Sequence, residues 1–345
     1  MSDTVFHSVI IVGAGPGGLS IAASLSDMGV QDVHILDRGR IGQSWLDYPP
    51  ETRLLSESGA QKDDNMIAGI NVWDVQPNIP HPTHVMYQKY LAEVAKRKNL
   101  QIHEEIDIDK VEFDENAKQF ILSTTNDKRF STNFLIWAAG MYSTPDEKLD
   151  SSTCFIHYSR IQDWKHITEN SVSVVGGANG ASEVVIQLAK PERTVRLICS
   201  KEFDVPLPID CLWKENRQLI KDLENQGLVE IIENFRVKKI SHDDTEYTIE
   251  STEGRTLKSP TRPIVCIGFL PNIDPVKEFV DTTQEGHDVF LTIDDSYQSK
   301  KQPGLFFGGT IAKLTHEEGF IRHFREYGEK IAKVISKNLT DTDSH

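Results

Sequence analysis

The chain has 345 residues, of which 38% are hydrophobic and 26% are charged, and its formal net charge is -15 at pH 7. This length suits two domains, and the composition is that of a soluble globular protein. Because so negative a surface repels phosphate backbones and anionic lipids, we expect neither nucleic acid nor a membrane as a partner. The chain opens without a basic region, and no apolar run approaches the roughly 18 residues of a membrane span, which predicts a cytoplasmic protein.

The first motif joins an apolar strand, residues 9–12, to a glycine-rich turn and an alanine-rich helix. Residues 13–18 of the turn read Gly-Ala-Gly-Pro-Gly-Gly. In this spacing the first glycine permits a tight bend, the second lets a pyrophosphate approach the backbone, and the third lets helix and strand pack closely. A second apolar strand, residues 33–36, ends at Asp37, where a carboxylate can accept hydrogen bonds from an adenosine ribose. The motif therefore predicts a dinucleotide-binding fold.

The segment after Asp37 is rich in glycine and carries two arginines. It predicts a loop around cofactor phosphates with Trp45 stacked against it, and the alternative is a surface turn with one buried aromatic side chain. Further along, Thr83 is expected to cap a helix. Alternating residues over 106–113, 119–124 and 130–132 predict a small antiparallel meander. A separate buried strand over 134–140 then meets a glycine, and the following turn marks a domain boundary.

A second strand, glycine turn and helix begin at residue 172. Ala178 and Ala181 replace the second and third glycines, so this copy matches the dinucleotide fingerprint less closely. Its next strand, residues 194–199, ends in Ser200 and Lys201 rather than in a carboxylate. Since a hydroxyl and a cation can accept a 2′-phosphate, this end favours NADPH over NADH, and the alternative is that Lys201 is only a solvated surface lysine.

The rest of the chain supplies the remaining elements of the two predicted dinucleotide-binding folds. We expect a helix over 212–225 that ends near Gly227, a second meander over 229–232, 237–240 and 247–251, and a buried strand ending at Gly268. A last strand leads to a long helix over 317–338, for which Thr315 and Glu318 form a capping box. The predicted fold class is α/β, with two Rossmann-like dinucleotide-binding domains, the second inserted into the first. The expected boundaries are 1–145 and 270–345 for the first domain and 146–269 for the second.

The four cysteines, Cys154, Cys199, Cys211 and Cys266, show no paired spacing. Neither a metal site nor a local redox disulfide is therefore expected. Cys199 and Cys266 lie in apolar, strand-like runs, which predicts buried and inert thiols.

Taken together, the two glycine motifs and the strands ending at Gly140 and Gly268 resemble the two-dinucleotide-binding flavoproteins. Residues 41–49 resemble the Gly-Gly-Thr-Trp loop of flavin-containing and Baeyer–Villiger monooxygenases, and residues 157–164 resemble the His end of their fingerprint. The Phe and Gly positions of that fingerprint fall on Ser151 and Thr153. Bacillithiol-disulfide reductase-like flavoproteins are similar in length, but their first glycine loop carries a Cys where this chain has Gly17.

The resemblance implies FAD in the first domain and NADPH in the second. It further implies a flavoprotein monooxygenase that oxygenates a small soft-nucleophile or carbonyl substrate with O2 through a C4a-peroxyflavin. The alternatives are a flavin reductase acting on a disulfide, quinone or protein acceptor, and a non-catalytic redox sensor. No oligomeric state is fixed, and a homodimer is compatible with the sequence.

No catalytic residue is assigned; His157 either orients the nicotinamide or fills a domain hinge. The residues expected at FAD are Gly13, Gly15, Gly18, Asp37, Arg38, Trp45 and, by resemblance only, Ile108. Those expected at NADPH are Gly176, Asn179, Ser200 and Lys201. Further expected cofactor-binding residues are Pro16, Gln43, Ser44, Ala139, Gly140, Gly177, Gly268 and Gly309.

Overall fold

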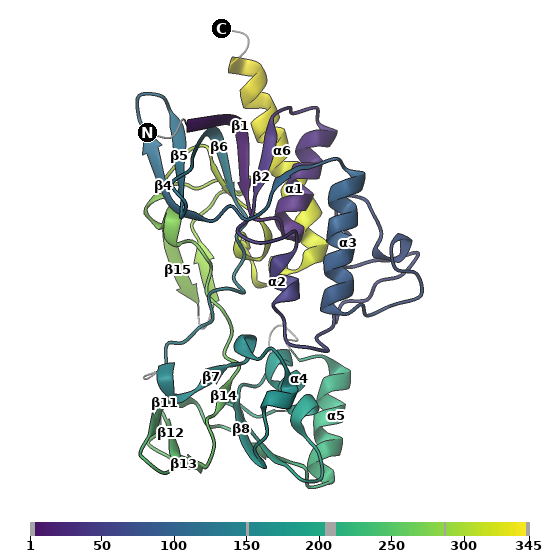
Figure 1. Cartoon of the computed structure of the whole chain (residues 1–345), viewed down its shortest axis with the longest axis vertical. Coiled ribbons are helices and arrows are strands. Elements are labelled where there is room, and N and C mark those ends of the chain that lie inside the picture. The colour runs from purple at the N-terminus through teal and green to yellow at the C-terminus, as the bar shows by residue number, and fades with distance from the viewer. Residues whose placement is uncertain (1–3, 150–151, 204–211, 286–287, 343–345) are drawn as a thin grey trace. The chain divides into compact units, whose positions relative to one another are not determined.

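The computed structural model describes residues 4–149, 152–203, 212–285 and 288–342. The chain divides into two compact units (Figure 1). The first unit comprises Met1–Leu46, Arg53–Thr144 and Leu270–His345, and the second comprises Asp47–Thr52 and Pro145–Phe269. Each unit is built on a sheet with helices of the Rossmann type, so the predicted α/β class is confirmed. The short segment 47–52, expected in the first domain, is grouped with the second unit.

The sheet of the first unit has the strand order β3-β2-β1-β6-β5-β4, and β17 also pairs with β6. Strands β3, β2, β1 and β6 run parallel, as β17 does to β6, whereas β5 and β4 run antiparallel to their neighbours. The strands are β1 (Thr4–Val12), β2 (Val33–Leu36), β3 (Gln101–His103), β4 (Ile108–Asp114), β5 (Gln119–Thr124), β6 (Arg129–Trp137) and β17 (Leu305–Phe307).

Strand β6 corrects the prediction of two separate strands at 130–132 and 134–140. It is continuous and pairs with β1 from Arg129 to Trp137, while its partner on the other side changes along its length. Its first half pairs antiparallel with β5, as in Phe120 opposite Thr132, and its second half pairs parallel with β17, as in Leu305 beside Leu135. The expected meander is therefore real, but its third strand is also a central strand of the dinucleotide-binding sheet.

The helices of the first unit are α1 (Pro16–Asp27), α2 (Gln43–Leu46), α3 (His84–Arg97) and α6 (Phe324–Thr342), and a hairpin forms from β15 (Thr282–Glu285) and β16 (Asp288–Leu291). Figure 1 shows α1 and α6 side by side, and they pack closely at Gly328, where an added Cβ would lie 2.6 Å from Ser24 Oγ. The predicted cap of α3 forms, because Thr83 Oγ1 accepts a hydrogen bond from Met86 N at 3.3 Å.

The long C-terminal helix starts later than predicted. Two short 3-10 turns, His316–Gly319 and Ile321–His323, precede α6. The capping box does not form, because the Thr315 side chain caps no amide and the Glu318 carboxylate accepts from Leu314 N at 2.9 Å instead. The Glu318 carboxylate thus bonds to the backbone before the 3-10 turn, and α6 begins only at Phe324.

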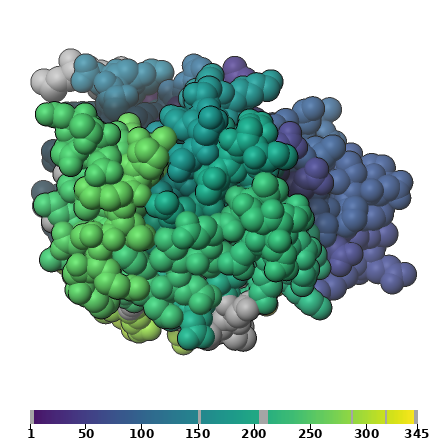
Figure 2. Space-filling view, turned by 90° about the horizontal axis from the view of Figure 1, so that it is seen from below, coloured from purple at the N-terminus to yellow at the C-terminus, as the bar shows by residue number. Residues whose placement is uncertain are grey.

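The second unit contains a parallel sheet in the order β10-β9-β8-β14-β7, with α4 (Asn179–Leu188) and α5 (Lys214–Asn225). One face of this unit is seen in teal and green in Figure 2. Its strands are β7 (Ile156–His157), β8 (Ser171–Val175), β9 (Thr194–Ile198), β10 (Val229–Ile232) and β14 (Ile264–Val265), and an antiparallel meander consists of β11 (Val237–His242), β12 (Tyr247–Ser251) and β13 (Thr256–Ser259).

The second meander is therefore shifted from its predicted position. Residues 229–232 form β10, which pairs parallel with β9 through Val229 beside Val195, so they belong to the dinucleotide-binding sheet. The meander is completed by β13 instead. Gly227 lies after α5 with φ +74°, as expected of a residue that ends a helix.

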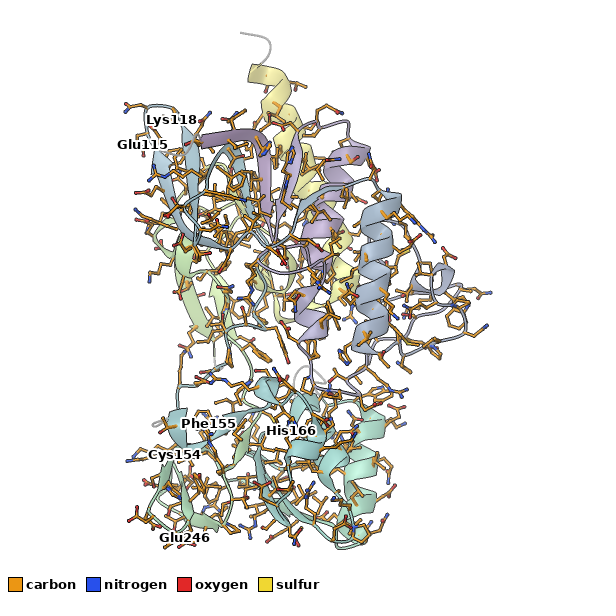
Figure 3. The ribbon with its side chains drawn as sticks, in the orientation of Figure 1. Glu115, Lys118, Cys154, Phe155, His166 and Glu246 are labelled. Atoms are coloured by element: carbon orange, nitrogen blue, oxygen red, sulfur yellow. The ribbon has the colours of Figure 1, made fainter. Side chains whose placement is uncertain are left out.

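Each unit has its own hydrophobic core. In the first, large buried side chains such as Trp137, Tyr87 and Phe306 pack together, and in the second the core includes Val174, Leu197 and Ile264. Polar pairs lie at the surface: Glu115 and Lys118 form an ion pair of 2.7 Å at the turn between β4 and β5 (Figure 3). Among the described residues, no helix has the length and apolar character needed to cross a membrane.

Candidate functional site

The first glycine loop lies between β1 and α1, and its glycines are required by the packing around them. Gly13 has φ +112°, and a Cβ there would lie 2.3 Å from the carbonyl oxygen of Ala138. A Cβ at Gly18 would lie 2.0 Å from Gly13 O. At Gly15 an added Cβ would meet no heavy atom within 4 Å, so the backbone there faces open space. This is the geometry that lets a pyrophosphate approach the loop and the first amides of α1, so the loop fits the predicted cofactor.

Asp37 joins the end of β2 to this loop. Its carboxylate accepts hydrogen bonds from Ala14 N at 2.6 Å and from Gly39 N at 2.8 Å. Burial raises the pKa of Asp37, while the two backbone hydrogen bonds act in the opposite direction. Ile106 N donates to Asp37 O at 2.8 Å, which places the segment leading into the buried Ile108 beside Asp37. The segment just before Ile108 thus contacts Asp37, the other residue predicted for the adenosine part of FAD.

The segment after Asp37 is held against the glycine loop. Gly42 N donates to Ala14 O at 3.0 Å, and α3 holds the segment from its other side through Gln88 Nε2, which donates to Ile41 O at 2.9 Å. The Trp45 ring packs edge-on against Tyr87, with ring centroids 4.7 Å apart. The side chain of Arg38 is exposed, and those of Gln43, Ser44 and Trp45 in α2 are half-buried.

The opposite side of the loop is lined by backbone from β6 and β17. Ala138 N donates to Val12 O at 2.8 Å, and Ala139 and Gly140 follow directly, Gly140 with φ +66°. An added Cβ at Gly17 would lie only 2.5 Å from the Cα of Gly309. Residues 13–18, 37–45, 139–140 and 309 therefore gather at the carboxyl edge of one parallel sheet, which is the edge where such folds bind ligands.

The second glycine loop, in the second unit, is built in a similar way. Gly176 has φ +146°, and a Cβ there would lie 2.6 Å from Cys266 O, whereas a Cβ added at Gly177 would meet no atom closer than Cys199 Sγ at 3.7 Å. The Asn179 side chain accepts hydrogen bonds from Trp213 N at 2.7 Å and Asn216 Nδ2 at 3.4 Å, so it connects α4 to α5. Ser200 and Lys201 are exposed just beyond the end of β9.

Burial strongly shifts the pKa values of several groups of the second unit, among them His157, Glu183 and Tyr48. Burial lowers the pKa of His157 to about 4, so its imidazole is neutral at pH 7; its Nε2 lies 3.1 Å from Gly268 O, and its Nδ1 lies 2.8 Å from Ser159 Oγ. These are ordinary hydrogen bonds within the unit. Burial raises the pKa of Glu183, on α4, to about 7, and burial and the nearby Glu183 raise the pKa of Tyr48 to about 12.

The described cysteines all belong to the second unit. Burial raises the pKa of Cys199 to about 12 and that of Cys266 well above its usual value, so neither supplies a thiolate near neutral pH. Cys154 is half-buried and precedes the buried Phe155 (Figure 3). Cys211 lies outside the described residues.

The sequence reasoning missed two features. The first is the close approach of Gly17 to Gly309. These glycines lie far apart along the chain, and the sequence holds no local signal that they meet. The second is a cluster of His7, His34 and His103, on strands that are neighbours in space but scattered along the chain.

Two nested dinucleotide-binding folds, each with a glycine loop at the end of a parallel strand, define a two-dinucleotide-binding oxidoreductase. The chain belongs to the pyridine nucleotide-disulphide oxidoreductase family, whose family model matches residues 10–309. Homologues in this family use FAD and NADPH, which is the cofactor pair predicted from the two glycine motifs.

Relatives of several kinds are similar to the chain. Bacilliredoxin reductase Bdr of Bacillus subtilis (strain 168) is 24% identical over 339 residues, which cover 96% of this chain and 98% of the relative. An uncharacterized oxidoreductase of the same organism, CzcO, is 26% identical, but the match covers only 57% of this chain and 56% of that protein. The chain thus spans little more than half the length of CzcO.

Solved structures show the same fold. Bacillithiol disulfide reductase Bdr (YpdA) from Staphylococcus aureus has a TM-score of 0.83 and 20% identity, covering 97% of this chain and 99% of that one. A flavin-containing monooxygenase from Stenotrophomonas maltophilia has a TM-score of 0.75 and 15% identity, covering 97% of this chain and 100% of that one. The fold therefore accommodates both of the activities that the sequence left open.

Proposed function

We propose that the chain is an NADPH-dependent FAD oxidoreductase that reduces a small two-electron acceptor, such as a quinone, without a thiol in its first glycine loop. The contact between Gly17 and Gly309 carries this proposal. Bdr-like flavoproteins place a Cys in this loop, and here the position has neither a sulfur atom nor room for one. The buried cysteines of the second unit have raised pKa values and offer no substitute thiolate.

The roles of the chain's own groups follow from their positions. The open backbone at Gly15 and the first amides of α1 hold the pyrophosphate of FAD, and Asp37 fixes the loop while it faces the adenosine ribose. Ser200 and Lys201 hold the 2′-phosphate of NADPH. Bound FAD supplies the ability to accept a hydride and pass on two electrons. One NADPH and one proton thereby convert one quinone into its hydroquinone.

Monooxygenation is a second candidate, and the loop at residues 41–49 favours it. This loop resembles that of flavin-containing monooxygenases, and here its residues 41–45 are held between the glycine loop and α3, with Trp45 against Tyr87. An oxygenating enzyme has to exclude water from its flavin, and a loop held by these contacts would contribute to that exclusion if it covered the bound cofactor.

Parallel measurements of acceptor and oxygen use test both candidates. The purified flavoprotein is mixed with NADPH, first without oxygen and with benzoquinone or a low-molecular-weight disulfide, then with oxygen and candidate sulfur, nitrogen or carbonyl substrates. The proposal expects stoichiometric quinone reduction without oxygen, whereas a monooxygenase consumes oxygen and yields oxygenated product rather than hydrogen peroxide. Turnover of disulfides alone, or cofactor binding without turnover, would overturn the proposal.

A further inference from the structure

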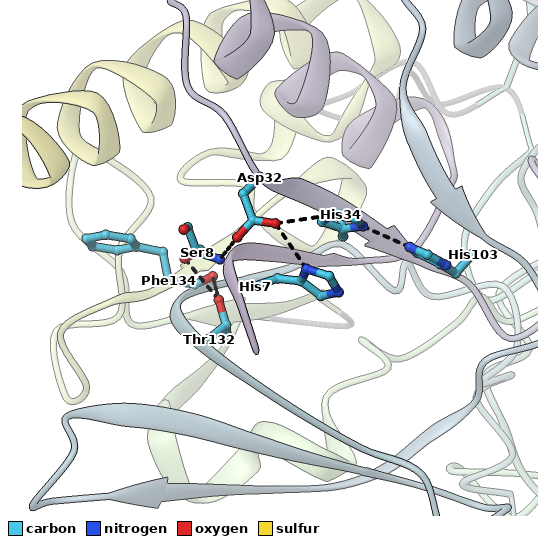
Figure 4. Close-up of polar contacts among 7 residues, drawn as sticks. All are labelled: His7, Ser8, Asp32, His34, His103, Thr132 and Phe134. Carbon is cyan, nitrogen blue, oxygen red and sulfur yellow. Dashed lines mark hydrogen bonds and ion pairs between the residues drawn. The ribbon is translucent and has the colours of Figure 1, made fainter. Parts of the chain in front are cut away.

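Three histidines from three strands meet on the sheet of the first unit (Figure 4). His7 lies in β1, His34 in β2 and His103 at the end of β3, and these strands are neighbours in the sheet. Each ring offers a nitrogen atom that lies within 4.8 Å of those of the other two. His34 Nδ1 is 2.8 Å from His103 Nε2, and the rings of His7 and His34 stack with centroids 3.6 Å apart.

The strand register explains why two of these side chains meet. Leu36 of β2 lies beside His103 of β3, and His34 is two residues before Leu36, so both imidazoles project from the same face. His7 lies two residues before Val9, the first residue of β1 that pairs with β2. The cluster therefore joins three adjacent strands, the outer strand β3 and its neighbours β2 and β1.

Asp32 adds a carboxylate to the cluster. Its Oδ1 is 3.1 Å from His7 Nδ1 and 3.1 Å from His34 Nε2, while its Oδ2 accepts a hydrogen bond from Ser8 N at 2.6 Å (Figure 4). The residue has φ +56°, a conformation that is uncommon outside glycine and that turns the chain into β2. A carboxylate fixed by a backbone amide and placed against imidazoles is the usual way in which proteins orient histidine ligands.

The composition of the cluster selects a class of ion. Three imidazoles with one carboxylate suit Zn²⁺, Co²⁺, Ni²⁺ or Cu²⁺, whereas Mg²⁺ and Ca²⁺ prefer oxygen ligands alone. Nitrogen atoms at a Zn–N distance of about 2.0 Å are about 3.3 Å apart around a tetrahedral ion. The observed separations, from 2.8 Å between His34 and His103 up to the limit of 4.8 Å, lie on both sides of that value. The three rings lie nearly parallel, with interplanar angles of 23° to 27°, so binding an ion requires the side chains to rotate until their nitrogens converge.

We propose that His7, His34 and His103 bind a divalent transition-metal ion, with Asp32 as a fourth ligand or as the residue that orients the imidazoles. His103 is exposed, so an ion can reach the cluster from solvent. The site also touches the cofactor-binding edge through the backbone, because Asp37 N donates to His103 O at 3.0 Å. A bound ion would tie β1, β2 and β3 together and hold the strand that ends at Asp37.

The test uses the FAD-loaded chain without a polyhistidine tag, since the chain carries 12 histidines of its own. After treatment with a chelator, the protein is titrated with Zn²⁺ in a calorimeter and with Co²⁺ in a spectrophotometer, at wavelengths beyond the flavin absorption. We expect one equivalent to bind, visible ligand-field bands from Co²⁺, and a higher thermal unfolding midpoint with Zn²⁺.

The variants His103→Ala and His34→Ala should bind Zn²⁺ at least about tenfold more weakly and should lose the Co²⁺ bands. His166→Ala removes an exposed histidine of the second unit (Figure 3) and should bind as the wild type does. FAD content and the unfolding midpoint without metal show whether each variant is folded. Equal binding by wild type and His103→Ala, or no uptake by folded wild type, would overturn the proposal and leave a purely hydrogen-bonded histidine cluster.

Discussion

At Gly17 the backbone of α1 approaches Gly309 so closely that the two glycines form one contact between the start and the end of the chain. Gly15, two residues earlier, faces open space in the same loop. Gly17 therefore serves the packing of the fold, whereas Gly15 is the position that we propose for the pyrophosphate of the cofactor. The glycine spacing predicts a pyrophosphate contact at Gly15, but it gives no role to Gly17, which lies between the second and third glycines of the motif.

Replacing these glycines should have different effects. Gly17→Cys forces α1 away from Gly309 and should cost about 1–3 kcal/mol of stability along with FAD binding. Gly15→Ala, at φ -81°, should leave the unfolding midpoint of the FAD-free protein unchanged while weakening FAD binding. Thermal unfolding and FAD titration measure both effects. A stable, flavin-loaded Gly17→Cys protein would contradict the contact.

Lys201 should determine the choice of nicotinamide cofactor. Lys201→Ala is expected to raise the KM for NADPH about tenfold and to leave the KM for NADH unchanged, because only NADPH carries the 2′-phosphate. Steady-state kinetics with both cofactors measure the difference. Lys238→Ala, which removes another exposed lysine of the second unit, is the matched control. Equal changes for NADPH and NADH would show that Lys201 does not contact the phosphate.

Glu183 should make stability depend on pH. Its folded-state pKa of about 7 lies above the usual value of 4.5, so the folded state retains a proton that the unfolded state has released. Stability is complete below pH 4.5 and falls as the pH rises through 7, by about 3 kcal/mol in all. Urea unfolding at pH 5.5 and pH 8 should show about 2 kcal/mol of this loss in the wild type and none of it in Glu183→Gln. The same loss in both proteins would assign it to another group.

Among the elements, α3 has a structural role beyond its own stability. Its N-terminus is capped by Thr83, and its side chains hold the loop around Trp45 through Gln88 and through His84, whose Nδ1 lies 2.6 Å from Trp45 O. We therefore expect that loosening the first turn of α3 also loosens residues 41–45, beside the proposed cofactor site.

Thr83→Ala should destabilise the first unit by about 1 kcal/mol, because Met86 N loses its hydrogen-bond acceptor. FAD affinity should fall with it, since the 41–45 loop depends on α3. Thr83→Ser keeps the hydroxyl group and should behave as the wild type does. Chemical denaturation and FAD titration are the measurements, and a loss of equal size in Thr83→Ser would argue against capping.

The sequence predicted those elements whose pattern is local. Both glycine loops, the Thr83 cap and the end of α5 at Gly227 follow from residues that lie close together along the chain. Apart from the capping box at Thr315, where a local hydrogen bond of Glu318 differs from the predicted one, the errors arose where a distant segment decides the outcome. Residues 229–232 join the parallel sheet because β9 offers an edge, and β6 continues past residue 132 because β17 arrives from far along the chain. Likewise, no local signal brings His7 to His103.

At the scale of the whole molecule, each unit has a separate core and a separate glycine loop. Scanning calorimetry of the FAD-free chain should therefore show two transitions. Added FAD should raise the temperature of only one of them, and NADP⁺ should raise that of the other, because a ligand stabilises the unit that binds it. A single transition that both ligands shift equally would show that the two units unfold together.

The late position of β17 in the sequence also affects how the chain folds during translation. The second unit has all of its strands by residue 269, so it can acquire its structure while translation is still in progress. The first unit has to wait for Leu305–Phe307 to pair with β6 and for α6 to pack on α1. Until then its early strands leave an edge unpaired, and a nascent chain that stalls before residue 305 exposes a partly built sheet to aggregation.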